Sequence, residues 1–513
     1  MNNVLEYLEK TVKKYPDKIA FVDEKEKITF NECYLNALKI GNYFIKEKIY
    51  KEPIYIFMNK SINMLQSFFG VLYSGNFYVP IDINMPIERI NLIINNVNAK
   101  YLIYDIENLD KVNCLKFEGK SILYNTLLEM DIDMFNINCV KNKVIDTDPV
   151  YISFTSGSTG IPKGVVGYHR GIIDYIDNLS KVLNIDENTV FGNQSPLHLD
   201  ACMKEIYCTL KCASTTYLIP KKLFSFPVQL VKYLNDNKIN TICWVVTALQ
   251  TISSFGTFDE IIPKYLHTIA FGSEVFLAKQ FNIWKKTLKN SRFINLYGPT
   301  EATGMSCYYE VDKILEENEK IPIGKPFLNT DIFLLNDNGE LVKNGEEGEI
   351  YIRGTCITYG YYNDFDKTSE VFVQNPLNNY FREIVYKTGD IGKYDENGIL
   401  HFISRKDYQI KHMGHRIELG EIDVNTSKIE KIKDCCTIYS KNDNKIVLYY
   451  CGEIKKIDIM KKLRDILPKY MLPNIIIQLD NIPLLSNGKK NRIELEKIYL
   501  KYKKARNKNE YKK

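Results

Sequence analysis

Long uninterrupted apolar runs are missing from this 513-residue sequence. The longest apolar segment, SFFGVLYSGNFYVPI at residues 67–81, is broken by Ser, Gly, Asn and Pro, so it does not form a membrane-spanning helix. The N-terminal stretch has apolar residues at helical spacing, but it carries Glu6 and Glu9 where a secretory signal would need an apolar core. We therefore expect a surface helix at the N-terminus and a cytoplasmic location.

Strong net charge and paired cysteines are missing as well. The 68 Lys and Arg against 63 Asp and Glu give a formal charge of +5, which is too small over this length to predict a nucleic-acid ligand. The twelve cysteines contain no C-x-x-C pair, so we expect structural thiols and no cysteine metal site. Cys435 and Cys436 lie in a strand-like run, where their side chains should point to opposite faces.

The middle of the chain alternates strand-like and helix-like patterns, which predicts an α/β fold with a parallel sheet. The expected order is strand 241–246, helix 247–255, strand 268–273, helix 277–288 and strand 292–297. The second helix should pack on the sheet through one apolar face made of Leu277, Phe281, Trp284 and Leu288.

After about residue 340 the pattern changes to short strands with turn signals between them, which predicts a small α+β unit. We expect strands at 348–354, 398–405 and 445–450. One late helix should bury a face made of Ile459, Met460, Leu463, Ile466 and Leu467. The charged tail at 501–513 should be solvated and frayed.

A run of hydroxyls and glycines, TSGSTGIPKG at residues 155–164, follows a strand-like segment. Glycine permits the backbone angles that turn several N–H groups toward one anion, and Lys163 adds positive charge. The run is not a Walker loop, because G-x-x-x-x-G-K-[ST] is absent and Pro162 opposes an immediate helix. From these residues it is either a phosphate-binding loop or a flexible surface turn, and its ten-residue length favours the phosphate-binding loop.

This loop resembles that of the adenylate-forming superfamily, which includes acyl-CoA synthetases, luciferases and peptide-synthetase adenylation domains. Five further motifs resemble the family in the same order: NLYGPTEAT at 295–303, YKTGDIGKY at 386–394, SRKDYQIKHMGHRIELGEI at 404–422, LPKYMLP at 467–473 and PLLSNGKKNR at 483–492. The resemblance implies a large domain at 1–404 and a small C-terminal domain at 405–513 that rotates about a hinge at Asp407. It also implies that ATP and Mg²⁺ are used.

The resemblance assigns roles to individual residues. Lys489 would bridge the substrate carboxylate and the α-phosphate, Thr300 would bond that phosphate, and Glu301 would hold Mg²⁺. Tyr297 would stack on adenine, and Asp390 and Arg405 would contact the ribose. The remaining nucleotide positions are Thr155, Ser156, Gly157, Ser158, Thr159, Gly160, Lys163, Gly272, Ser273, Asn295 and Gly298. Alone, the motifs around Asp390 and Asp407 would also suit turn caps.

Asp200 lies where amino-acid-specific members of the family carry the carboxylate that pairs with the substrate's α-ammonium. A buried carboxylate needs a cation, which a fatty acid does not offer, although Asp200 could instead cap the helix that follows. The other pocket positions are Ala201, Lys204, Cys243, Ile269, Phe271, Leu296, Gly304 and Met305. Phe271 should shorten the pocket. Lys204 would pair with a second substrate carboxylate if it points inward, or be solvated if it points outward.

These features predict an enzyme that joins AMP to an amino acid and passes the aminoacyl group to a thiol. The chain ends soon after Lys489, so the thiol should come from a separate carrier protein with a phosphopantetheine arm, or from coenzyme A. The overall resemblance is to stand-alone and peptide-synthetase adenylation enzymes, including D-alanine to carrier-protein ligases. The alternatives are an acyl-CoA ligase for an aryl or fatty acid and a non-catalytic nucleotide-binding protein.

Overall fold

A computed structural model describes residues 1–157, 160–441, 443–484 and 490–510. The contacts within it divide the chain into two compact units. The first unit comprises Met1–Ile83, Asn96–Phe154 and Gly164–Lys406; the second comprises Asn84–Asn95, Thr155–Lys163 and Asp407–Lys513. Two short segments that we expected in the large domain, 84–95 and 155–163, therefore group with the C-terminal part of the chain.

The largest sheet of the first unit has nine strands in its described part, in the order β15-β14-β13-β12-β11-β9-β10-β1-β2. The strands are β1 Ile19–Val22, β2 Lys27–Thr29, β9 Val190–Asn193, β10 Thr215–Leu218, β11 Thr241–Val245, β12 Thr268–Gly272, β13 Arg292–Tyr297, β14 Cys307–Glu310 and β15 Lys325–Pro326. Strands β11, β12 and β13 are parallel neighbours, as the sequence pattern predicted.

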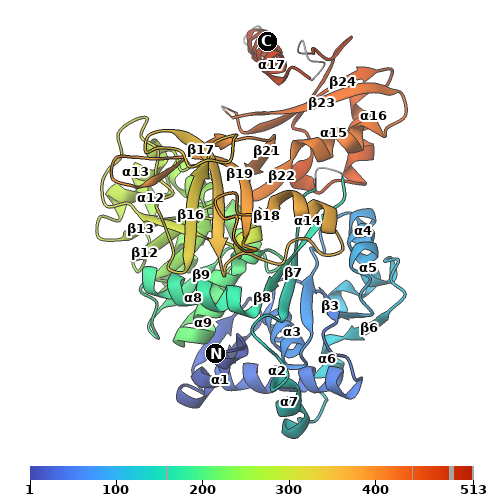
Figure 1. Cartoon of the computed structure of the whole chain (residues 1–513), viewed down its shortest axis with the longest axis vertical. Coiled ribbons are helices and arrows are strands. Elements are labelled where there is room, and N and C mark those ends of the chain that lie inside the picture. Colours follow the sequence, from blue (N-terminus) through green and yellow to red (C-terminus); the bar gives the residue numbers. More distant parts are fainter. Residues whose placement is uncertain (158–159, 442, 485–489, 511–513) are drawn as a thin grey trace. The chain divides into compact units, whose positions relative to one another are not determined.

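These three strands are buried on both faces, which explains their continuous apolar sequences. One face packs on α11 Val246–Ser254 and α13 Ala278–Thr287. Of these two helices, α13 is labelled in Figure 1, near β12 and β13. The helix between β12 and β13 is confirmed, and Phe281 and Trp284 are fully buried in this core. The prediction for Leu277 is wrong: it precedes α13 and is 60% exposed, because the helix begins one residue later.

Two further sheets complete the first unit. One runs β6-β5-β3-β4-β7-β8, with β3 Pro53–Phe57, β4 Phe77–Pro80, β5 Tyr101–Tyr104, β6 Lys120–Leu123, β7 Pro149–Thr155 and β8 Lys163–Tyr168. The other contains β16 Thr330–Leu335, β17 Glu347–Gly354, β18 Phe372–Gln374, β19 Ile384–Tyr394 and β20 Leu400–Arg405. The strands predicted at 348–354 and 398–405 are therefore confirmed.

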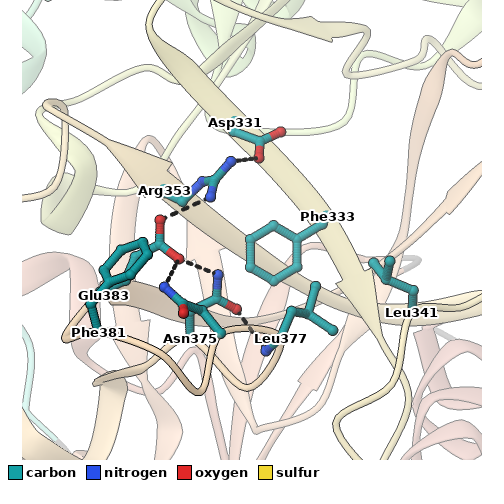
Figure 2. Close-up of a pocket in the computed structure, with 9 residues that line it drawn as sticks. Asp331, Phe333, Leu341, Arg353, Asn375, Leu377, Phe381 and Glu383 are labelled. Carbon is teal, nitrogen blue, oxygen red and sulfur yellow. Dashed lines mark hydrogen bonds and ion pairs between the residues drawn. The ribbon is translucent and has the colours of Figure 1, made fainter.

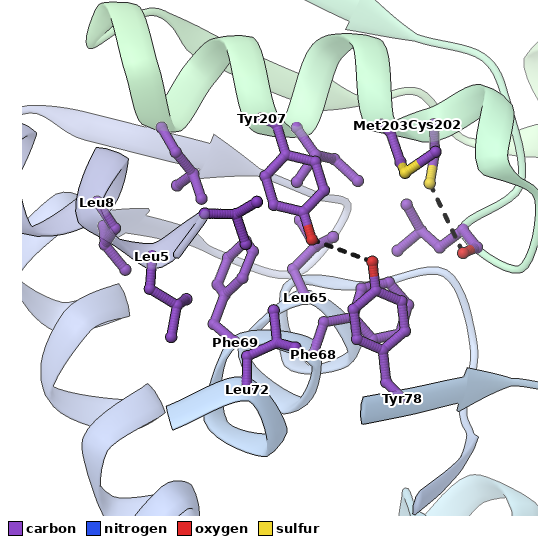
Figure 3. Packing of buried hydrophobic residues seen from close by; sticks show 14 of the residues in the cluster. Leu5, Leu8, Leu65, Phe68, Phe69, Leu72, Tyr78, Cys202, Met203 and Tyr207 are labelled. Carbon is purple, nitrogen blue, oxygen red and sulfur yellow. Dashed lines mark hydrogen bonds between the residues drawn. The ribbon is translucent and has the colours of Figure 1, made fainter. Parts of the chain in front are cut away.

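Helix α9 Met203–Cys212 carries the candidate pocket residue Lys204 and is held in the core between the larger sheets. Figure 3 shows Tyr207 of α9 above Phe68 and Leu72 of α3 Ile62–Tyr73. The Tyr207 hydroxyl lies 3.1 Å from that of Tyr78. The position of α9 is thereby fixed by packing and by buried polar contacts, among them the 2.7 Å contact between the hydroxyls of Thr209 and Thr216.

The described part of the first unit contains further α-helices. They are α1 Leu5–Lys14, α2 Phe30–Lys46, α5 Leu109–Asn113, α6 Tyr124–Leu127, α7 Met134–Lys141, α8 His169–Val182, α10 Pro227–Asp236, α12 Thr257–Glu260 and α14 Phe365–Val371. The N-terminal helix is confirmed by α1. No helix in the described ranges is long and apolar enough to cross a membrane.

The second unit is a small α+β structure, as predicted. It contains α4 Ile87–Val97, α15 Leu419–Ser427, α16 Lys456–Arg464 and α17 Arg492–Glu510, with strands β21 Gln409–His412, β22 His415–Glu418, β23 Ile432–Ser440, β24 Lys445–Gly452 and β25 Ile475–Gln478. Cys435 and Cys436 of β23 enter different cores, which confirms that they face opposite ways. All twelve cysteines are free.

Two predictions about the C-terminal helices need correction. Helix α16 ends at Arg464, so Ile466 and Leu467 lie beyond it, and only Ile459 and Leu463 of the expected face are buried within the helix. The expected frayed tail is helical as far as Glu510. Residues 511–513 lie outside the described part of the chain.

Candidate active site

A small hollow opens where the parallel strands β11, β12 and β13 end. Carboxyl ends of parallel strands meet at one edge of a sheet, and this edge is where open α/β sheets bind ligands. Six of the expected pocket residues line the hollow, namely Ala201, Lys204, Cys243, Phe271, Leu296 and Met305. Gly272 and Ser273, which we expected near the nucleotide, line it too.

Other lining residues were missed from the sequence. Ser195, Trp244, Val245 and Ala270 complete the walls. Trp244 and Ala270 are the immediate strand neighbours of expected positions, and the period-two alternation of a strand would assign both to the opposite face. Ile269 does not line the hollow: it lies deeper in β12, fully buried against α11 and α13.

Asp200 begins the short helix η2 Asp200–Cys202 that leads into α9. Neither helix has a side-chain capping bond at its N-terminus, so the capping role considered for Asp200 is not seen. Burial raises the pKa of the Asp200 carboxyl, while the Thr300 hydroxyl and the charge of Lys204 act in the opposite direction. Asp200 is therefore a carboxylate in a poorly solvated place with a hydroxyl beside it.

Two glycines shape the backbone of the segment that ends beside Asp200. Gly304 has a φ of +90°, and a Cβ on it would lie 3.9 Å from an Asp200 carboxylate oxygen. A Cβ on Gly298 would lie 2.5 Å from the Cα of Met305, which no side chain could accept. The segment from 298 to 305 thus folds back tightly on itself beside Asp200.

Buried ionisable side chains surround the base of the hollow. Lys204 is 5% exposed and Glu205 is fully buried. Both carboxylate oxygens of Glu205 and both amide atoms of Asn193 lack hydrogen bonds in the described structure. Lys60 donates to the carbonyl oxygens of Asn193, Gln194 and Ile219 at 3.0, 3.3 and 3.4 Å. Burying ionisable groups costs free energy, and functional sites commonly contain such groups.

Tyr297, Asp390 and Arg405 come together from three strands. The Tyr297 hydroxyl donates to Oδ2 of Asp390, and Nη1 of Arg405 donates to Oδ1 at 2.7 Å. Asp390 lies inside β19, so the alternative of an Asx turn is wrong. Burial raises the pKa of Tyr297, so it stays a hydroxyl donor. The side-chain amide nitrogen of Asn295 donates a 2.8 Å hydrogen bond to the Pro322 carbonyl oxygen.

Glu301 lies on the short helix η4 Thr300–Ala302 and has no exposed surface. Its Oε1 accepts from the Tyr361 hydroxyl at 2.7 Å, and its carbonyl accepts from the Thr358 hydroxyl at 3.0 Å. Mg²⁺ is usually held by one or two carboxylates together with substrate phosphates. A single oriented carboxylate is therefore a suitable protein ligand for this ion.

The phosphate loop is described, within the second unit, from Thr155 to Gly157 and from Gly160 to Lys163. Ser156 donates to the Arg416 carbonyl at 2.9 Å, and the Gly157 N–H donates to Oε2 of Glu421 at 3.2 Å. Lys163 lies 3.8 Å from Oε1 of Glu418. Protein acceptors thus hold several of the groups expected to bind phosphate.

Gly160 has a φ of +85°, and the Thr155 hydroxyl is buried without a hydrogen bond. Ser158 and Thr159 lie outside the described residues.

The expected hinge residue, Asp407, accepts a hydrogen bond from the Gln409 N–H at 3.1 Å, as a turn cap would. Lys489 lies outside the described residues. The residues that follow it are anchored by ion pairs: Lys490 to Asp434 at 2.8 Å and Arg492 to Asp423 at 2.9 Å. Lys490 therefore has a structural partner.

A second hollow lies on the sheet that contains β16 and β17, and none of its lining residues belongs to a motif (Figure 2). Arg353 on its wall pairs with Asp331 and Glu383, both at 2.8 Å. Glu383 also accepts from the amides of Asn375 and Asn378. Because these charges already satisfy one another, the hollow is a poor candidate for catalysis.

Comparison with known proteins places this geometry in a family. The family model described as AMP-binding enzyme matches residues 8–362. Tyrocidine synthase 1 of Brevibacillus parabrevis is 30% identical over 497 residues, covering 96% of this chain and 44% of that protein. The D-alanine–D-alanyl carrier protein ligase of Bacillus licheniformis is 30% identical over 517 residues, covering 95% of this chain and 98% of the ligase.

Solved structures agree on the fold. The adenylation domain AlmE of Vibrio cholerae, in complex with glycyl-adenosine-5′-phosphate, has a TM-score of 0.84 at 18% identity and covers 97% of this chain and 98% of its own. The chain spans less than half the length of several relatives it matches, such as tyrocidine synthase 1. The family predicted from the motifs is confirmed, and this chain belongs to the AMP-binding enzyme family.

Proposed function

We propose that this chain is a ligase that activates an amino acid with ATP and passes the aminoacyl group to the phosphopantetheine thiol of a separate carrier protein. The observation that carries the proposal is Asp200, a poorly solvated carboxylate beside Thr300, whose chain neighbour Ala201 lines the hollow at the strand ends. A zwitterionic substrate supplies the cation that such a carboxylate needs. The carrier ligase similar over its whole length supports transfer to a carrier, with coenzyme A as the alternative thiol.

In the first half-reaction a substrate carboxylate oxygen attacks the α-phosphorus of ATP. The new O–P bond replaces the bond to the β-phosphate bridge, and pyrophosphate leaves. Asp200 pairs with the α-ammonium and fixes the carboxylate next to Thr300, whose hydroxyl donates to the α-phosphate. Lys489 brings positive charge between the two anions and so lowers their repulsion.

The ribose and the metal are held by the remaining residues of the first unit. Asp390, held in place by Arg405, accepts hydrogen bonds from the ribose hydroxyls, and Tyr297 offers its ring to adenine. Glu301 would hold Mg²⁺, and the ion would neutralise charge on the phosphates. In the second half-reaction the carrier thiolate attacks the acyl carbon and AMP leaves, after rotation about Asp407 withdraws Lys489.

The test is amino-acid-dependent exchange of labelled pyrophosphate into ATP, across L- and D-amino acids, with Lys489→Ala as the control. We expect exchange with one acid or a few acids, lost in the control and reduced at least about 100-fold by Asp200→Asn. Activity on an aryl or fatty acid that survives Asp200→Asn would identify an acyl-CoA ligase instead. A folded, ATP-binding protein that is silent with every carboxylate would refute catalysis. A cytoplasmic location stays a prediction.

A further inference from the structure

Charge is distributed unevenly along the chain. Residues 407–513 contain 24 Lys and Arg against 14 Asp and Glu, whereas residues 1–406 contain 44 against 49. The C-terminal segment therefore carries a net charge of +10, and the rest of the chain carries −5. A concentration of one sign in a small part of a protein produces a local potential that attracts surfaces of the opposite sign. The small overall charge of +5 conceals this positive region.

Helix α17 places part of this charge on a fixed face of the second unit. Its inner face packs on β23 and β24 through Leu495 and Tyr499, which are 0% and 1% exposed (Figure 1). The Tyr449 hydroxyl of β24 also donates to the Leu495 carbonyl, at 2.7 Å. The helix is therefore held against the sheet, and the direction in which its outer face points is fixed.

The outer face of α17 is a stripe of lysines and aliphatic side chains. Residues three, four and seven positions apart share one face of an α-helix. Ile493 and Leu500 are 70% and 42% exposed. Lys497, Lys501 and Lys504 are exposed on the same face. These five residues are called the basic stripe below.

The described part of the chain balances little of the charge of the basic stripe. Lys497 lies 3.3 Å from Glu494, but the two side chains are 63% and 40% exposed, so water screens the pair. Lys501 and Lys504 form no ion pair with any residue in the described ranges. The basic stripe therefore keeps a positive charge that faces solvent.

The aliphatic members of the basic stripe favour a lipid surface over a soluble polyanion. Ile493 and Leu500 lie about 10 Å apart along the helix and outside the core on which α17 packs. Such side chains are not needed to bind the phosphates of a nucleic acid. At a bilayer they enter the headgroup region, while the lysines beside them stay at the level of the phosphates. An acidic protein would need a pocket for each of them, whereas a bilayer accepts them without a fixed geometry.

We infer that the basic stripe binds the surface of an anionic lipid bilayer and so holds this protein at a membrane. The lysines contact the lipid phosphates, and Ile493 and Leu500 enter the headgroup layer. The association is peripheral, because the side chains of one face of a folded helix make the contacts. The inference does not depend on the proposed function and adds a binding surface to it.

The experiment measures sedimentation of the 513-residue chain with large lipid vesicles. Vesicles of phosphatidylcholine alone are compared with vesicles in which about a third of the lipid is phosphatidylglycerol. We expect binding only to the anionic vesicles, weakened when salt is raised from about 0.1 to about 0.5 M, because salt screens exposed charges. Lys497→Gln, Lys501→Gln and Lys504→Gln in one protein should weaken binding about 100-fold, since each lysine near an anionic surface contributes about a factor of 5.

Two further variants make the result specific to this face. Ile493→Gln combined with Leu500→Gln keeps every charge and should weaken binding about 10-fold, because less apolar surface leaves water. Lys456→Gln, Lys461→Gln and Arg464→Gln remove the same charge from α16, which packs on the opposite face of the sheet of β23 and β24. This control should bind as the wild type does. Thermal melting verifies that each variant is folded.

The outcomes decide between a membrane and other anionic partners. Binding to anionic vesicles that is lost in the lysine variant, weakened in the aliphatic variant and kept in the α16 variant would support the inference. Absence of wild-type binding to anionic vesicles, or equal losses in the two charge variants, would overturn it. Equally tight binding to polyglutamate or single-stranded DNA that the aliphatic variant retains would overturn it too, and would identify a soluble polyanion as the partner. None of these measurements uses ATP, so amino-acid activation stands or falls separately.

Discussion

The Tyr361 hydroxyl donates a 2.7 Å hydrogen bond to Oε1 of Glu301, a carboxylate with no exposed surface. Tyr361 does not belong to any of the recognised motifs, and it lies sixty residues after Glu301 in the chain. The bond fixes the carboxylate that we propose as the Mg²⁺ ligand. Partners of this kind orient a ligand before the metal arrives.

We predict that Tyr361→Phe raises the Mg²⁺ concentration for half-maximal pyrophosphate exchange by about 10-fold or more. The ring and its packing are kept, and only the hydroxyl is lost. Tyr168→Phe is a matched control, because the Tyr168 hydroxyl donates at 2.8 Å to the Thr355 carbonyl instead. An unchanged Mg²⁺ requirement in Tyr361→Phe would contradict a metal role for Glu301.

Asp390 accepts from two directions, from Tyr297 and from Arg405. We predict that Asp390→Asn weakens ATP binding by about 10-fold or more, because an amide cannot accept from the ribose hydroxyls and from Arg405 as a carboxylate does. Equilibrium binding of ATP measures the effect directly. Asp395→Asn, in the turn after β19, should bind ATP normally; equal losses in both variants would point to misfolding of the sheet.

Part of this architecture could be predicted from the sequence. Strands β11, β12 and β13 and helices α11 and α13 follow from hydrophobic periodicity, because their apolar residues recur at strand or helix spacing. The short helix α12 was not expected. The residues at which helices begin and end could be predicted less accurately from the sequence. Leu277 belongs to the correct pattern, but it precedes the first turn of α13 and is exposed.

The site was predictable only where a motif identifies it. Asp390 and Glu301 lie in recognised strings, whereas Tyr361 and Ala270 contact or line the site through tertiary packing that no local pattern records. The orientation of Lys204 is a further example. The sequence around a helical lysine does not show whether its side chain faces water or a hollow. The orientation of Lys204 is determined by the packing of α9.

Arg492 begins α17, three residues after Lys489. It donates to Asp423 at 2.9 Å and lies 3.8 Å from the ring of Tyr408. We expect these contacts to position the chain that carries Lys489. Because Lys489 acts on the transition state more than on binding, we predict that Arg492→Met lowers kcat for exchange about 10-fold with little change in KM. Arg464→Met, at the exposed end of α16, is the control. A change confined to KM would argue against this explanation.

The buried carboxyl of Glu205 makes stability depend on pH in an unusual direction. Burial raises its pKa from the ordinary value of 4.5 to about 7, although the charges of Lys204 and Lys60 act in the opposite direction. Between these two pH values the folded protein keeps a proton that the unfolded chain releases. The folded state therefore binds more protons, and stability falls as pH rises through this window.

Glu205→Gln removes that titration, because a neutral amide has no proton to lose. We predict that the free energy of unfolding of the wild type, relative to Glu205→Gln, falls between pH 5 and pH 8. The fall is at most about 3 kcal/mol, because a tenfold change in proton affinity between the folded and unfolded states corresponds to about 1.4 kcal/mol. Urea unfolding at several pH values measures the difference. If the gap between the two proteins is the same at pH 5 and pH 8, Glu205 is ionised in the folded state throughout, and burial does not raise its pKa.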